Sequence, residues 1–67
     1  SIPGQYARMD VQWRLRDLGN EAHTLTCRNS LQTPAGSSID ELVTAQQNNV
    51  KRLASAIRQA ASSARCP

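Results

Sequence analysis

The chain has 67 residues, a mass of 7.3 kDa, a net charge of +3, and 39% hydrophobic and 19% charged residues. No apolar run approaches the roughly 18 residues that a membrane span needs, and three Gly and three Pro exclude collagen-like and strongly disordered classes. With one Trp, one Tyr and no Phe, the chain is expected to form a single small domain with a thin core.

The first structured element is predicted to be a β-hairpin over residues 6–28, after a flexible lead-in at residues 1–5. Apolar and polar residues alternate from position 9 to position 16, which is typical of a half-buried strand. A turn at Gly19-Asn20 and a shorter second strand over residues 22–28 are expected to follow.

The register of this hairpin can be predicted from the faces that it creates. A loop with an odd number of residues, such as Gly19-Asn20-Glu21, pairs Leu15 with Leu25 and Trp13 with Cys27. All apolar side chains then lie on one face, and the predicted core is Met9, Val11, Trp13, Leu15 and Leu25. The alternative is an all-α chain with helices near residues 5–18 and 38–64, because Met, Arg, Leu and Gln favour helix individually.

One long helix is predicted over residues 38–64, after a polar linker at residues 29–37. Ser38 with Glu41 three residues later is typical of a capping box at a helix N-terminus. Residues at alternating steps of four and three from Ile39 to Ala64 are apolar except for Gln46, and they form a heptad-like seam. We expect this seam to cover the hairpin and to bind a partner or a second copy where it is left uncovered. The candidates on the seam are Val43, Val50, Leu53 and Ile57.

The two cysteines, Cys27 and Cys66, are predicted to form a disulfide, because their spacing fits neither a CxxC redox motif nor a zinc site. A small domain of this size needs such a covalent link, a partner or a second copy. Disulfides persist outside the cytosol, so a periplasmic or extracellular location is expected. Two thiols and one histidine cannot complete a structural zinc site, so neither a metal nor a cofactor is expected.

Catalysis is not expected. His23 is predicted to lie on the apolar side of the second strand opposite Asp17, but no serine or free thiol is placed to act as a nucleophile. The basic residues Arg14, Arg16 and Arg28 are candidates for contact with an acidic protein surface. Nucleic acid is not expected as a partner, because residues 6–28 hold four Arg against three acidic residues, a net charge of only +1.

The sequence therefore predicts an α+β domain over residues 6–67, in which a two-stranded hairpin packs on one long C-terminal helix and a disulfide joins the two. The expected function is that of a non-catalytic periplasmic or secreted protein-binding module, an accessory or inhibitor of an envelope apparatus or enzyme. Two alternatives stay open: a DNA-binding ribbon–helix dimer with reduced thiols, and a structural unit that self-assembles, as a homodimer or larger assembly, through the helix seam.

Overall fold

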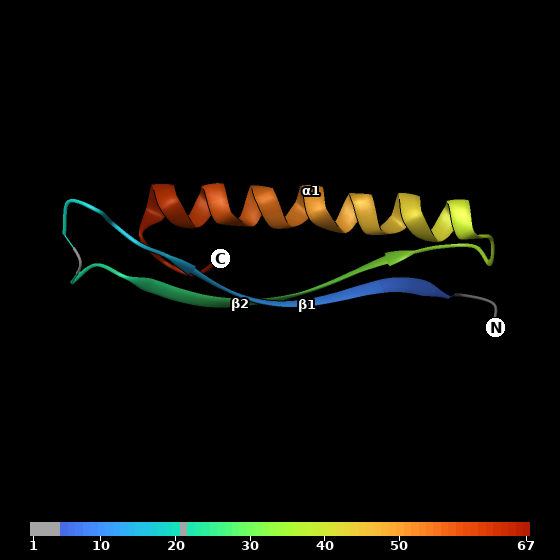
Figure 1. Cartoon of the computed structure of the whole chain (residues 1–67), viewed down its shortest axis with the longest axis horizontal. Coiled ribbons are helices and arrows are strands. Elements are labelled where there is room, and N and C mark those ends of the chain that lie inside the picture. The colour runs from blue at the N-terminus through green and yellow to red at the C-terminus, as the bar shows by residue number, and fades with distance from the viewer. Residues whose placement is uncertain (1–4, 21) are drawn as a thin grey trace.

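The computed structural model describes residues 5–20 and 22–67, so the predicted lead-in lies, apart from Gln5, outside the described residues. Two antiparallel strands, β1 (Tyr6–Leu15) and β2 (Leu25–Pro34), form a hairpin, and one helix, α1 (Ile39–Ser63), lies along one of its faces (Figure 1). The predicted α+β architecture is confirmed. The all-α alternative is wrong, because the alternation of apolar and polar residues outweighs the helix propensity of β1.

The hairpin has the predicted register. Leu15 pairs with Leu25 and Trp13 with Cys27, so the apolar side chains share one face. The connecting loop covers residues 16–24; it has an odd number of residues, as expected, but is longer than a three-residue turn. Asp17 shapes its first part: its side-chain oxygen accepts the Gly19 N–H at 2.9 Å. Glu21, the last residue of the predicted turn, lies outside the described residues.

The predicted linker at residues 29–37 is wrong for most of its length, because β2 continues to Pro34. The second strand also begins at Leu25 instead of residue 22. Inward-facing positions on β2 continue as Asn29, Leu31 and Thr33, and Leu31 is buried while the other two are half-buried. Two polar residues at inward positions hid this part of the strand from an analysis based on apolar alternation.

The core lies between the inner face of the hairpin and one side of α1. Its most buried side chains are mostly small: Ala7, Cys27, Leu31, Ala45, Asn49 and Ala60. The predicted core residues Met9, Val11, Trp13, Leu15 and Leu25 all lie on this inner face, but each is only half-buried. A single helix is therefore too narrow to cover the inner face. The indole N–H of Trp13 donates to Asn29 Oδ1 on the other strand at 2.8 Å.

The helix begins where the capping box predicts. Ser38 Oγ accepts the Glu41 N–H at 3.1 Å and donates to the Glu41 carboxylate at 2.8 Å, so the two residues satisfy each other. The helix ends at Ser63, one residue before the predicted end, because Ala64 adopts a left-handed conformation with a φ of 59°. Its N–H then closes the last turn on Ala60 O at 2.8 Å.

The Cys27–Cys66 disulfide is confirmed and fixes the direction of the helix. The ten residues of β2 span about 33 Å and the 25 residues of α1 about 37 Å. After a short turn, α1 therefore runs back antiparallel to β2 and returns the chain end to the beginning of that strand (Figure 1). Ala60 is fully buried in this arrangement. The result is an elongated domain of 47 × 15 × 15 Å.

Candidate functional site

The helix does not turn its whole apolar seam to the hairpin. Leu53 and Ile57 are half-buried, but Val43 and Val50 are 50% and 52% exposed, and Ile39 is 78% exposed. The seam therefore covers the hairpin only in part, and the expected uncovered part includes Val43 and Val50. The side of α1 that meets the hairpin is centred instead on three buried residues, Ala45, Asn49 and Ala60.

The polar residue Asn49 explains why the helix turns this side, and not its apolar seam, to the hairpin. Its side chain is 0% exposed, and its amide is satisfied on both sides. The Asn49 Nδ2 group donates to Ala7 O at 3.1 Å and to Gln46 Oε1 at 3.0 Å, and Asn49 Oδ1 accepts from Thr33 Oγ1 at 2.6 Å. A buried amide with these partners anchors one helix face to both strands, since breaking any of the bonds would leave a buried polar atom unpaired.

Two further side chains hold the flanks of α1. Gln46 Nε2 donates to Arg8 O on β1 at 3.1 Å, and Arg52 Nη1 donates to Gln32 O on β2 at 2.9 Å. Arg8 and Gln32 face each other across the hairpin, so the helix is held at the same level on its two sides. The polar run at residues 46–49, an interruption in the apolar seam, was the sequence signal for this anchor.

Because Gln46 marks the β1 side of α1, Val43 and Val50 also lie on that side, one turn before and after it. We call Ile39, Val43 and Val50 the apolar stripe. The three residues follow at intervals of four and seven positions, which places them on one side of a helix. Single exposed apolar residues are common on soluble proteins, but a continuous row of large ones along one helix is typical of a binding surface.

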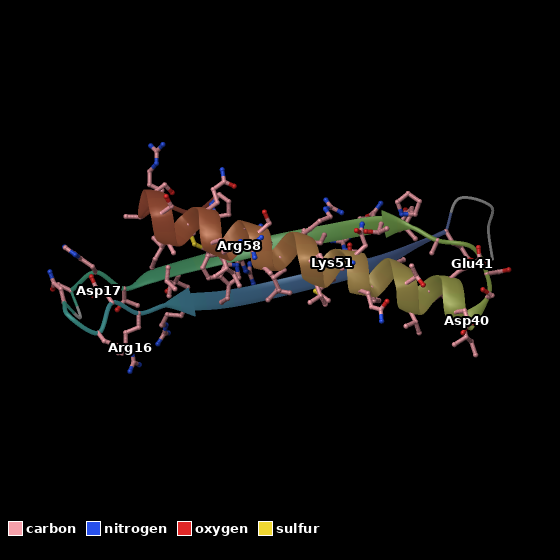
Figure 2. The ribbon with its side chains drawn as sticks, turned by 90° about the horizontal axis from the view of Figure 1, so that it is seen from above. Arg16, Asp17, Asp40, Glu41, Lys51 and Arg58 are labelled. Carbon is pink, nitrogen blue, oxygen red and sulfur yellow. A yellow bond between two sulfur atoms is a disulfide. The ribbon has the colours of Figure 1, made fainter. Side chains whose placement is uncertain are left out.

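The predicted basic candidates lie away from the apolar stripe, toward the loop end of the hairpin and on its outer face. Arg14 and Arg28 lie on the outer face of the hairpin, and Arg16 begins the loop beside Asp17 (Figure 2). All three are exposed, and within the part of the chain that the structure describes their side chains form no ion pair. We call these three residues the basic end.

Arg8, which also lies on the outer face of the hairpin, forms an ion pair, in contrast to the residues of the basic end. Its Nε lies 3.0 Å from Asp10 Oδ2, and Ser30 Oγ donates to Asp10 Oδ1 at 2.6 Å. The Ser30 hydroxyl, followed by the Arg8 guanidinium, holds the pKa of the Asp10 carboxyl below its ordinary value. Asp10 is thus a fixed negative charge on the outer face of the hairpin at neutral pH.

The expected position of His23 is wrong. It is exposed in the loop, outside β2, and its ring nitrogens lie 3.3 and 3.5 Å from the amide nitrogen of Asn20. Asp17 is occupied with the Gly19 N–H, so the two residues do not form a hydrogen-bonded pair. Among residues 5–20 and 22–67, no group of three or more His, Cys, Asp or Glu side chains is placed to hold a metal ion, and α1 is not apolar enough to cross a membrane.

The model of the family described as ABC-type transport auxiliary lipoprotein component matches residues 1–58. Because the match covers most of the chain, the chain belongs to this family. No curated protein and no solved structure matches it. The family and the disulfide together place the chain in the cell envelope as an accessory component, which agrees with the expected periplasmic location.

Proposed function

We propose that this member of the transport auxiliary family is a non-catalytic protein-binding module in the periplasm, which docks another protein component of an ABC-type transport apparatus. The observation that carries the proposal is the apolar stripe, because three large apolar side chains on one helix face are left in water. An auxiliary component acts through the machinery that it assists, so a surface of this kind on such a component is best explained by a protein partner.

The stripe has the properties of a docking surface. It lies on a helix that is capped at its N-terminus and held to both strands by Gln46, Asn49 and Arg52, so little conformational freedom is lost on binding. The basic end offers a second contact, since Arg14, Arg16 and Arg28 are free to meet acidic side chains. The DNA-binding alternative has no comparable support, because the thiols that it requires to be reduced are oxidised.

The substitution Val43→Asp tests this function. It is expected to weaken binding to the docking component about tenfold to a hundredfold, because a charge would be buried in an apolar contact. Val43 is exposed in the free domain, so its melting temperature should stay nearly unchanged. Binding is measured by titration calorimetry against each purified component of the apparatus encoded with this chain.

The matched control is Thr44→Asp. Thr44 is the neighbouring residue, is also β-branched and exposed, and lies on another side of the helix from Val43. Its variant should bind the component as tightly as the unmodified chain. Equal weakening by both substitutions, or the lack of any binding component of the apparatus, would contradict the proposed function.

A further inference from the structure

The main-chain groups of the hairpin alternate between the partner strand and the open edge. The Ala35 N–H donates to Gln5 O at 2.9 Å, which extends the register of the hairpin by one hydrogen-bonded pair. In an antiparallel ladder, hydrogen-bonded pairs occur at every second residue. The odd-numbered residues of β1 therefore bond to β2, and the even-numbered ones turn their N–H and C=O groups to the free edge.

The two free edges differ in how well they are protected. On β2, Arg52 occupies the carbonyl of Gln32, Pro34 has no N–H, and the Cys66 sulfur lies 3.3 Å from Thr26 O. On β1, Gln46 occupies the carbonyl of Arg8. Among the described side chains, none bonds to the edge groups of Asp10, Gln12 or Arg14, so this stretch of β1 is an unprotected edge. Such an edge is a template for another strand.

We propose that a second copy of this chain pairs with this stretch of β1, antiparallel and centred on Gln12, so that two hairpins form a four-stranded sheet with both helices on the same face. The stretch from Asp10 to Arg14 is itself centred on Gln12, so a two-fold axis there satisfies the open edge groups of all three even-numbered residues in each copy. The dimer places the two helices side by side, with the apolar stripe of each on the side toward the other helix, because the stripe lies on the β1 side of α1. Charge-swapped variants of β1 leave the stripe unchanged, so the dimer can be tested apart from the proposed function.

Charge complementarity favours this centre over those at Asp10, Val11 and Arg14. With Gln12 at the axis, Asp10 lies opposite Arg14 of the second copy on the outer face, twice by symmetry, and opposite charges at directly opposed positions stabilise a sheet. A centre at Asp10 or at Arg14 would set like charges against each other. A centre at Val11 would set Arg8 opposite Arg14 of the second copy within the ladder. A centre at Trp13 would set Asp10 opposite Arg16, but Arg16 lies outside β1, so the edge groups of Asp10 would stay open. The centre at Gln12 sets Arg8 opposite Arg16 only beyond the end of β1, where Gln46 already occupies the carbonyl of Arg8.

The inner face favours the same arrangement. The centre at Gln12 sets Val11 opposite Trp13 of the second copy and Met9 opposite Leu15. These four residues are half-buried in the single chain because α1 is too narrow to cover them. The pairs occupy the closely spaced, non-hydrogen-bonded positions of the ladder, where side chains pack against each other directly. Dimerisation would therefore remove apolar surface from water along the whole contact.

A pair of charge-swapped chains tests the proposal. Asp10→Arg sets arginine against Arg14, and Arg14→Asp sets aspartate against Asp10, so each variant alone should dimerise about tenfold or more weakly than the unmodified chain. An equimolar mixture of the two restores both opposite-charge pairs and should recover the dimer as a mixed species. The masses are measured by analytical ultracentrifugation at low ionic strength, where charge interactions are least screened.

A cross-linking measurement locates the contact. A photoreactive benzoylphenylalanine at Gln12 should join two copies, whereas the same group at Arg28, which faces Gln12 from β2, should not. The proposal would be overturned by an unmodified chain that stays monomeric up to its solubility limit, by a mixture that pairs no better than the single variants, or by cross-linking that is stronger from Arg28 than from Gln12.

Discussion

Asn49→Asp is expected to lower the free energy of unfolding by about 3–5 kcal/mol, because it places an unpaired charge at a fully buried position. The substitution keeps the size and shape of the side chain. It replaces the two donated bonds to Ala7 O and Gln46 Oε1 by contacts between a carboxylate and two acceptor oxygens. Urea denaturation followed by circular dichroism measures the change. For a domain of 67 residues, the expected loss is a large share of the total stability.

The pH dependence of this variant has a defined sign. Burial among acceptors raises the pKa of the new carboxyl in the folded state above its value in the unfolded chain. The folded state then binds the proton more tightly, so the destabilisation is full at neutral pH and decreases as the pH falls below the raised pKa. Gln47→Glu is the matched control, since Gln47 is an exposed amide two residues away that takes no part in the Asn49 hydrogen bonds, and it should cost little. Equal losses in both variants would contradict the anchoring role of Asn49.

Replacing both cysteines, Cys27→Ser with Cys66→Ser, is expected to cost about 4 kcal/mol, because the bridge closes a loop of about 40 residues in the unfolded chain. Cys27 is buried and Cys66 follows the end of α1, so the last turns of the helix should loosen first. Amide hydrogen exchange around Ala60 measures that local change, and thermal denaturation measures the loss of stability.

Reduction of the unmodified chain with a thiol reagent is the control for this double variant. It opens the same loop without changing the sequence, so the reduced chain and the serine variant should melt within a few degrees of each other. A serine variant that melts at the temperature of the oxidised chain would show that the bridge contributes nothing to stability, and the account of the fold would then lack its main support.

The parts of the fold that follow from local chemistry could be predicted from the sequence. Alternation in β1 gave the strand, and the demand for one apolar face gave the register that pairs Trp13 with Cys27. The capping box at Ser38 gave the start of the helix, and the two cysteines gave the bridge. Each of these signals depends on neighbouring residues or on a single pairing.

The parts that depend on buried polar residues could not be predicted in the same way. Asn29 and Thr33 break the apolar alternation, so the second half of β2 was expected to be a linker. Asn49 was absent from the predicted seam, although it lies at the centre of the helix face that packs on the hairpin. A polar side chain reads as exposed in a sequence unless its partners are known, and here the partners are Ala7, Gln46 and Thr33.

The prediction of the candidate surfaces was affected in the same way, because a buried polar residue was not recognised. The seam that includes Val43 and Val50 was correctly identified as apolar, but its rotation about the helix axis could not be predicted without Asn49. Small residues contributed as well, because Ala45 and Ala60 let α1 approach the hairpin closely and leave the larger side chains outside. The exposed stripe follows from packing geometry and not from composition.

The thiol state of the protein in its native envelope tests most directly the central claim, that a disulfide-linked domain presents these surfaces outside the cytosol. Intact cells are treated with a thiol-blocking reagent, and the protein is then digested and mapped without reductant. The account predicts one peptide pair joined through Cys27 and Cys66 and no blocked cysteine. Blocked thiols at either position, or a bridge between the Cys66 residues of two copies, would contradict it.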